Sequence, residues 1–249
     1  MQDKYSIFTS KMKLNNEEIK ARALLLIKNH VDEPEETFIT KLEPPAAALW
    51  KKTNELKSQY KDLMTNPNWK QIEKKDTYTS YSMPGEEGMI YKKSEGIIDC
   101  SPLEVIAFIN FHERKSMYDL NYKTGKCLKS YPNNIDIMYE RFNGKLIFSV
   151  RDFVFVYSKY FNISDGTIQS IATDALDIMK EESGAVRASL KLGGYFLQPE
   201  GDKTKAVYIN SSNLKGNIPG FFSNSVAENQ GSLVSRINEA IKKFCIEKK

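Results

Sequence analysis

The chain has 249 residues, of which 41% are hydrophobic, so it can bury a large core in one domain or in two small ones. Its net charge is +4, and its 36 basic and 32 acidic side chains are interspersed, which argues against nucleic-acid binding. The longest apolar runs, such as residues 23–27, have five residues and are far shorter than the roughly 20 residues that span a bilayer. We therefore expect no transmembrane helix.

The N-terminal segment and the cysteines bear on the compartment. Residues 1–45 contain seven basic and eight acidic side chains, unlike the acid-poor composition of a transit peptide. Cys100, Cys127 and Cys245 are far apart and odd in number, which favours free thiols over a disulfide framework. The cytoplasm or another reducing compartment is expected, and a mitochondrial association without a recognisable transit peptide stays open.

A first helix is predicted from about residue 17 to His30. Asn15 or Asn16 can cap it, and the carboxylates of Glu17 and Glu18 lie at its positive end.

Further helices are marked by prolines. Pro44-Pro45 begins a second predicted helix, and Asn66-Pro67 ends it. Ser101-Pro102 gives a cap and a favourable first position for a third. The second helix carries a stripe that needs a surface to lie on: Leu49, Trp50, Thr53, Leu56, Tyr60 and Leu63.

Most of the remaining chain has the pattern of short strands. Segments rich in β-branched and aromatic residues follow one another, which predicts an antiparallel meander. Predicted strands lie at 76–82, 88–91, 135–142, 145–157, 167–172, 185–192, 195–198 and 206–210. Predicted turns between several of them are Pro84-Gly85, Asn143-Gly144, Asp165-Gly166, Gly193-Gly194 and Glu200-Gly201-Asp202.

A long amphipathic helix is predicted after Pro219-Gly220, with one apolar side and one polar side. Its apolar stripe consists of Phe222, Val226, Leu233, Ile237, Ile241 and Phe244. A curved antiparallel sheet closed by such a helix forms a container. We interpret residues 46–249 as one α+β domain and residues 1–45 as an N-terminal helical extension.

Four short stretches in the second half occur in a recognisable order. They are Arg-Asp-Phe-Val at 151–154, Gly-Ala-Val-Arg-Ala at 184–188, Lys-Ala-Val-Tyr-Ile at 205–209 and Asn-Leu-Lys-Gly-Asn-Ile-Pro at 213–219. Together they resemble motifs of the START family, the steroidogenic acute regulatory protein-related lipid transfer domains. The resemblance covers roughly residues 46–249 and implies a helix-grip fold, in which a curved antiparallel sheet wraps around a long C-terminal helix.

The resemblance also implies a tunnel that holds one lipid. Strand alternation puts Phe153, Phe155 and Tyr157 on one face of their strand and Val154 and Val156 on the other. The alternative interpretation is that the aromatic face packs in a solid hydrophobic core and lines no tunnel. The residues that we expect to contact a lipid are Thr124, Phe148, Phe153, Phe155, Tyr157, Phe222, Val226 and Leu233.

One departure from the family concerns charge. Many relatives have an arginine deep in the cavity where this chain has Tyr157, and the matching acidic position is interpreted as Thr124. Two neutral hydroxyl groups would replace an ion pair and avoid its desolvation. We therefore expect that no arginine holds a phospholipid head group here.

Catalytic motifs are missing from the sequence. His30 and His112 are the two histidines, and the nucleophile, zinc and Cys-x-x-Cys patterns are absent. We expect no enzyme activity, no cofactor and no metal. A ligand-binding enzyme of the wider helix-grip superfamily remains a third alternative.

Two main functions stay open. The first is a lipid-binding or lipid-transfer protein that encloses a sterol, phospholipid or other apolar lipid and touches membranes transiently. The second is a non-transferring accessory or scaffold subunit of a larger, mitochondrial or membrane-associated assembly. Its protein partner would bind through residues 1–45, where Leu24, Leu25 and Ile27 are apolar.

Overall fold

The computed structural model describes residues 4–30, 35–86, 89–144, 149–216 and 230–247, with the backbone alone at 35, 36 and 247. Its helices are α1 (Ser6–Thr9), α2 (Glu17–Asn29), α3 (Glu35–Lys41), α4 (Pro44–Thr65), α5 (Pro102–Ile109) and α7 (Leu233–Glu247), with the 3-10 helices η2 (His112–Met117) and η3 (Leu176–Ile178). Its strands are β1 (Lys70–Lys74), β2 (Tyr78–Pro84), β3 (Ile90–Ile98), β4 (Tyr122–Tyr131), β5 (Ile135–Phe142), β6 (Val150–Phe161), β7 (Ile168–Asp174), β8 (Ala185–Arg187), β9 (Ser189–Glu200) and β10 (Lys203–Asn213).

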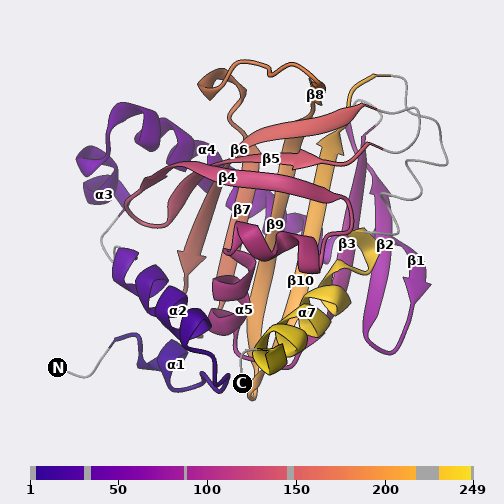
Figure 1. The fold of residues 1–249 in the computed structure, drawn as a ribbon. Helices are drawn as coiled ribbons and strands as arrows, with labels where there is room; N and C mark the ends of the chain where they lie inside the picture. The colour runs from indigo at the N-terminus through magenta and orange to yellow at the C-terminus, as the bar shows by residue number, and fades with distance from the viewer. Residues whose placement is uncertain (1–3, 31–34, 87–88, 145–148, 217–229, 248–249) are drawn as a thin grey trace.

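These strands form one curved sheet, with helices on both of its faces (Figure 1). The order across the sheet is β1-β2-β3-β10-β9-β7-β6-β5-β4, and all of these pairs are antiparallel. The short β8 pairs in parallel with β6. The helix-grip architecture predicted from the sequence is confirmed.

Helix α4 covers the convex face of the sheet. Its Tyr60 is fully buried and donates its hydroxyl proton between two backbone oxygens, Gly194 O and Val207 O, each 3.0 Å away. Thr53 on the same stripe donates to Ser158 Oγ at 2.9 Å. The stripe predicted from residue spacing therefore lies on the sheet as expected.

Helices α5 and α7 lie on the concave side, and α2 packs beside α5 (Figure 1). The Ser101 cap predicted for α5 is present and forms a capping box, since Ser101 accepts from Glu104 N while the Glu104 carboxylate accepts from Ser101 N. Phe244 of α7 packs on Phe108 with ring centroids 5.6 Å apart. The main core therefore lies between these helices and the sheet.

The N-terminal segment contributes to this same core. Ile19, Ala23 and Leu26 of α2 are almost fully buried, and Phe8 packs edge-on against Phe161 of β6 at 5.6 Å. Glu104 Oε1 accepts two backbone hydrogen bonds, from Lys13 N and Leu14 N, each 2.6 Å long. Residues 5–30 are thus packed onto the domain that follows them, with α2 capped by Asn16 as predicted.

Several elements differ from the prediction. Strands β1 and β4 were not predicted, because they are edge strands rich in lysine rather than in β-branched residues. Helix α3 occupies a segment where the sequence predicted no structure. The turn predicted at Gly193-Gly194 is wrong, since both glycines lie inside β9. The predicted terminal helix is seen from Leu233 onward, and its first half lies outside the described residues.

Candidate functional site

A cavity of about 160 Å³ lies between the concave face of the sheet and the helices that cover it. Strands β5, β6, β7, β9 and β10 line one side, while α5, η2 and α7 line the other. Its described walls comprise Ile109, Asn110, His112, Lys115, Tyr118, Asp119, Asn121, Met138, Glu140, Phe142, Asn143, Arg151, Phe153, Phe155, Tyr157, Ala172, Leu190, Gly193, Gly194, Tyr195, Tyr208, Asn210, Ser212, Leu214, Gln230 and Leu233.

The wall that β6 supplies is apolar. Phe153 and Phe155 point inward as alternation predicts, and Ala172 and Leu190 from neighbouring strands pack with them. Phe142 meets Phe153 edge to face, with centroids 5.5 Å apart. This wall offers a guest molecule hydrocarbon and ring surface.

Four tyrosines also line the cavity: Tyr118, Tyr157, Tyr195 and Tyr208. The rings of Tyr195 and Tyr208 stack at 4.9 Å. Burial raises the pKa of all four phenols above the usual value of 10. At neutral pH the four groups therefore stay uncharged and can donate hydrogen bonds.

The wall near η2 carries charge. Lys115 Nζ lies 2.6 Å from Glu140 Oε2, and the Glu140 side chain is only 6% exposed. The same ammonium group sits over the rings of Tyr122 and Phe142, at 5.8 and 5.3 Å from their centroids. The two charges neutralise one another and give the cavity one polar side.

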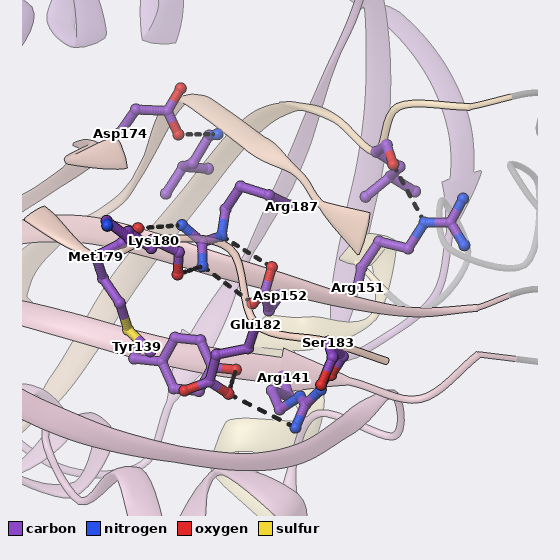
Figure 2. Close-up of polar contacts among 12 residues, drawn as sticks. Tyr139, Arg141, Arg151, Asp152, Asp174, Met179, Lys180, Glu182, Ser183 and Arg187 are labelled. Carbon is purple, nitrogen blue, oxygen red and sulfur yellow. Dashed lines mark hydrogen bonds and ion pairs between the residues drawn. The ribbon is translucent and has the colours of Figure 1, made fainter. Parts of the chain in front are cut away.

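Arg151 borders the cavity but is engaged by the backbone. Its guanidinium donates to Ser149 O at 2.7 Å, Leu214 O at 3.2 Å and Lys215 O at 3.1 Å. Figure 2 shows this side chain turned toward the strand-end loop. Arg151 therefore holds the segment after β10 in place.

A buried ion pair fixes β6 to β8. Arg187 donates to both oxygens of Asp152, at 2.9 and 3.1 Å, and its side chain is 3% exposed while that of Asp152 is 1% exposed (Figure 2). Arg187 also donates to Met179 O and Lys180 O. Asp152 belongs to the Arg-Asp-Phe-Val motif and Arg187 to the Gly-Ala-Val-Arg-Ala motif. Their ion pair positions the strand that carries Phe153 and Phe155.

The structure places the residues predicted to contact a lipid in three groups. Phe153, Phe155, Tyr157 and Leu233 line the cavity together. Thr124 is exposed on the edge strand β4 and is not among the lining residues. Phe148, Phe222 and Val226 lie outside the described residues.

The predicted pairing of Thr124 with Tyr157 is wrong. Strand β4 pairs with β5 and not with β6, so the residue opposite Tyr157 is Asp136. Asp136 binds Lys159 at 2.6 Å, and the Lys159 side chain is fully buried. A buried charge pair is therefore present, two residues farther along β6 than the family pattern suggested.

Sequence reasoning also missed part of the lining. Tyr195 and Tyr208 were included in predicted strands, but which face each strand buried could not be read from short runs. Alternation on β10 does give the signal, since Ala206, Tyr208 and Asn210 share a face that pairs with Tyr195 and Gly193.

The sequence matches the START domain family over residues 50–244. The chain belongs to the START domain family. This membership supports lipid binding in general. The region described contains no cluster of three or more side chains suited to a metal ion. A helix long and apolar enough to cross a membrane is likewise not found among the described residues.

Solved structures agree with the family assignment. Human StAR-related lipid transfer protein 5 is similar with a TM-score of 0.71 and 22% identity, covering 82% of this chain and 99% of that protein. A STAR-related lipid transfer protein from Xanthomonas axonopodis is similar with a TM-score of 0.62 and 17% identity, covering 70% of this chain and 99% of that one. Comparison with curated sequences gives no match. At these identities the structural likeness shows the fold.

Proposed function

We propose that this protein encloses one hydrophobic molecule, a lipid, in the cavity and transfers it between membranes that it touches transiently. The observation that carries the proposal is the inward-facing aromatic and aliphatic wall of β6, β7 and β9 in a member of the START family. Each methylene moved from water into such surroundings contributes roughly 0.8 kcal/mol. The wall therefore favours an aliphatic or ring-bearing guest.

The cavity must enlarge to admit a complete lipid. Its volume of about 160 Å³ is close to that of an engineered protein cavity that holds benzene. Leu214, which directly follows β10, and Leu233, the first residue of α7, both border it. We place the entrance at this border, where separation of α7 from the strand end would widen the cavity.

The polar groups favour a binding role over catalysis. The cavity phenols have a raised pKa, so they are poor bases and poor nucleophiles at neutral pH. His112, at the edge of the cavity, lies 3.3 Å from Glu113 on the partly exposed helix η2. Because Arg151 already donates to three carbonyl oxygens, we also propose that no arginine binds a phospholipid head group.

Lipid loading tests the proposal. The purified chain would be incubated with vesicles that contain phosphatidylcholine, cholesterol, diacylglycerol and free fatty acid, and its mass measured under native conditions. We expect a complex with one lipid per chain, and movement of a fluorescent analogue of that lipid from donor to acceptor vesicles. A chain that stays lipid-free contradicts lipid binding, and a loaded chain that moves no analogue contradicts transfer.

A second function is favoured by one surface feature. Leu24 and Leu25 are 55% and 45% exposed on α2, whereas Ile27 packs against the core. If a protein partner docks there, a tagged chain should co-purify a defined protein, and Leu24→Ser with Leu25→Ser should abolish this. A Lys28→Ser variant on the same helix serves as the control. Equal recovery with all three chains contradicts the accessory role.

A further inference from the structure

Tyr157 is the last residue of β6 that lines the cavity, next to polar surroundings that differ from the rest of the apolar wall. Its neighbours on the same face of β6 are Phe155 and Phe153, which line the cavity with it. The next inward-facing residue in the other direction is Lys159, which is buried. Tyr157 therefore separates the cavity from a buried charge.

That charge acts directly on the phenol ring. Lys159 Nζ lies 4.3 Å from the centroid of the Tyr157 ring and 2.6 Å from Asp136 Oδ2. Burial acts to raise the pKa of the Asp136 carboxyl, but the charge and hydrogen bonds of Lys159 and Ser130 outweigh it and lower that pKa. Lys159 thus faces an ionised carboxylate at hydrogen-bond distance. A cation over the ring face draws electron density from the phenol and strengthens its O–H group as a donor.

The hydroxyl group itself lacks a proper partner. The Tyr157 oxygen is closed off from solvent and makes no hydrogen bond of normal geometry with the part of the chain that is described. Ser170 lowers the pKa of Tyr157, which is the effect of a group that donates toward the phenol oxygen, so it offers the phenol proton no acceptor. Its Oγ also accepts a hydrogen bond from Tyr195 N at 3.1 Å. Buried donors without a partner are rare in folded proteins, so this one calls for a functional explanation.

We propose that the Tyr157 hydroxyl is the donor that recognises a neutral oxygen acceptor, such as a carbonyl or ether oxygen, on the bound hydrophobic molecule. The inference rests on the proposed function and specifies the chemical class of the ligand. In the free protein the residue lines the cavity and its hydroxyl is closed off from solvent. A guest whose acceptor oxygen reaches the hydroxyl satisfies it, whereas a pure hydrocarbon leaves it unpaired.

Two probes of equal shape test this inference. Acetophenone and α-methylstyrene differ only in a C=O group in place of C=CH2, and both are small enough for the cavity in its present size. Calorimetric titration would measure their affinities for the wild type, for Tyr157→Phe and for the matched control Tyr139→Phe. Tyr139 lies on the neighbouring strand, does not line the cavity and donates to Glu182 at 2.8 Å.

The wild type should bind acetophenone about 3- to 10-fold more tightly, relative to α-methylstyrene, than Tyr157→Phe does. Tyr139→Phe should keep the wild-type preference. Tyr157→Phe should also melt no lower than the wild type, because it removes a buried donor that has no partner in the free protein. Low melting of this variant would overturn the proposal, since the hydroxyl would then be satisfied without a ligand.

The remaining outcomes are equally decisive. An equal preference in the wild type and Tyr157→Phe would overturn the role of Tyr157 and leave lipid binding intact, provided that native mass spectrometry shows a loaded chain. A wild type that binds neither probe would overturn the donor proposal. If the chain also took up no lipid from vesicles, the proposed function would fall with it.

Discussion

Replacing Asp152 with alanine is expected to lower the free energy of unfolding by about 3 to 5 kcal/mol. The change leaves the Arg187 guanidinium buried without its carboxylate, because the two side chains are only 1% and 3% exposed and bind through two hydrogen bonds. Arg187 would keep its bonds to Met179 O and Lys180 O, which do not neutralise its charge. Urea unfolding followed by circular dichroism measures the loss.

Two further variants separate the loss of the buried ion pair from a general loss of charge. Asp202→Ala removes a carboxylate that binds Lys13 at 2.7 Å on the surface, where both side chains are more than half exposed, and should leave the urea midpoint nearly unchanged. The double variant Asp152→Ala with Arg187→Met should lose less than the sum of the two single changes. Strict additivity would contradict the buried ion pair.

Replacing Gly194 with alanine should destabilise the protein by about 3 kcal/mol or more. A Cβ atom at this position would lie 2.0 Å from Ser170 O on the adjacent strand β7, and a backbone oxygen cannot move away without disturbing the β7–β9 pairing. Gly194 O also accepts the hydroxyl proton of Tyr60, so the displacement would reach α4. The thermal midpoint of the purified variant measures the effect.

The neighbouring glycine provides the matched control. A Cβ atom at Gly193 would meet two side-chain atoms, Leu190 Cδ1 at 3.3 Å and Asn210 Nδ2 at 3.4 Å, which can shift by a few tenths of an ångström. Gly193→Ala should therefore cost at most about 1 kcal/mol. Equal losses from the two substitutions would contradict the close backbone approach that we assign to Gly194.

Local sequence signals predicted much of the fold. The Asn16 cap, the Pro44 start of α4 and the Ser101 cap of α5 were predicted because each depends on a few adjacent residues. The motifs around Arg151 and Arg187 then indicated the family, and the family implied the helix-grip architecture. Topology of this kind depends on distant pairings that local patterns do not specify.

Two of the errors have a common physical origin, since they concern contacts between residues that are far apart in sequence. Gly193 and Gly194 have the composition of a turn, but they lie inside β9, where another strand comes close. Thr124 was assigned to the cavity although its strand is one position too far out in the sheet. In both cases the position of the residue depends on which strands are neighbours in the sheet.

The candidate site was predicted in part. Alternation along β6 predicted that Phe153, Phe155 and Tyr157 share one face of the strand, and this face lines the cavity. The ion pair of Asp136 with Lys159 was missed, because its two residues are far apart in sequence and each alone has the pattern of a solvent-exposed charge. The cavity could therefore be found only in the structure, whereas its apolar wall could be predicted from the sequence.

The loaded mass of an Ala172→Leu chain tests the central claim most directly. Ala172 lines the cavity beside Tyr157, its partner on the adjacent strand, so the three carbon atoms added by leucine would occupy space that the bound lipid needs. After incubation with mixed-lipid vesicles, the wild type and the surface control Ala48→Leu should each carry one lipid per chain, and Ala172→Leu should carry less than about a tenth of that, a deficit of roughly 1.4 kcal/mol in binding. Equal loading of all three chains would contradict a lipid site inside the curved sheet.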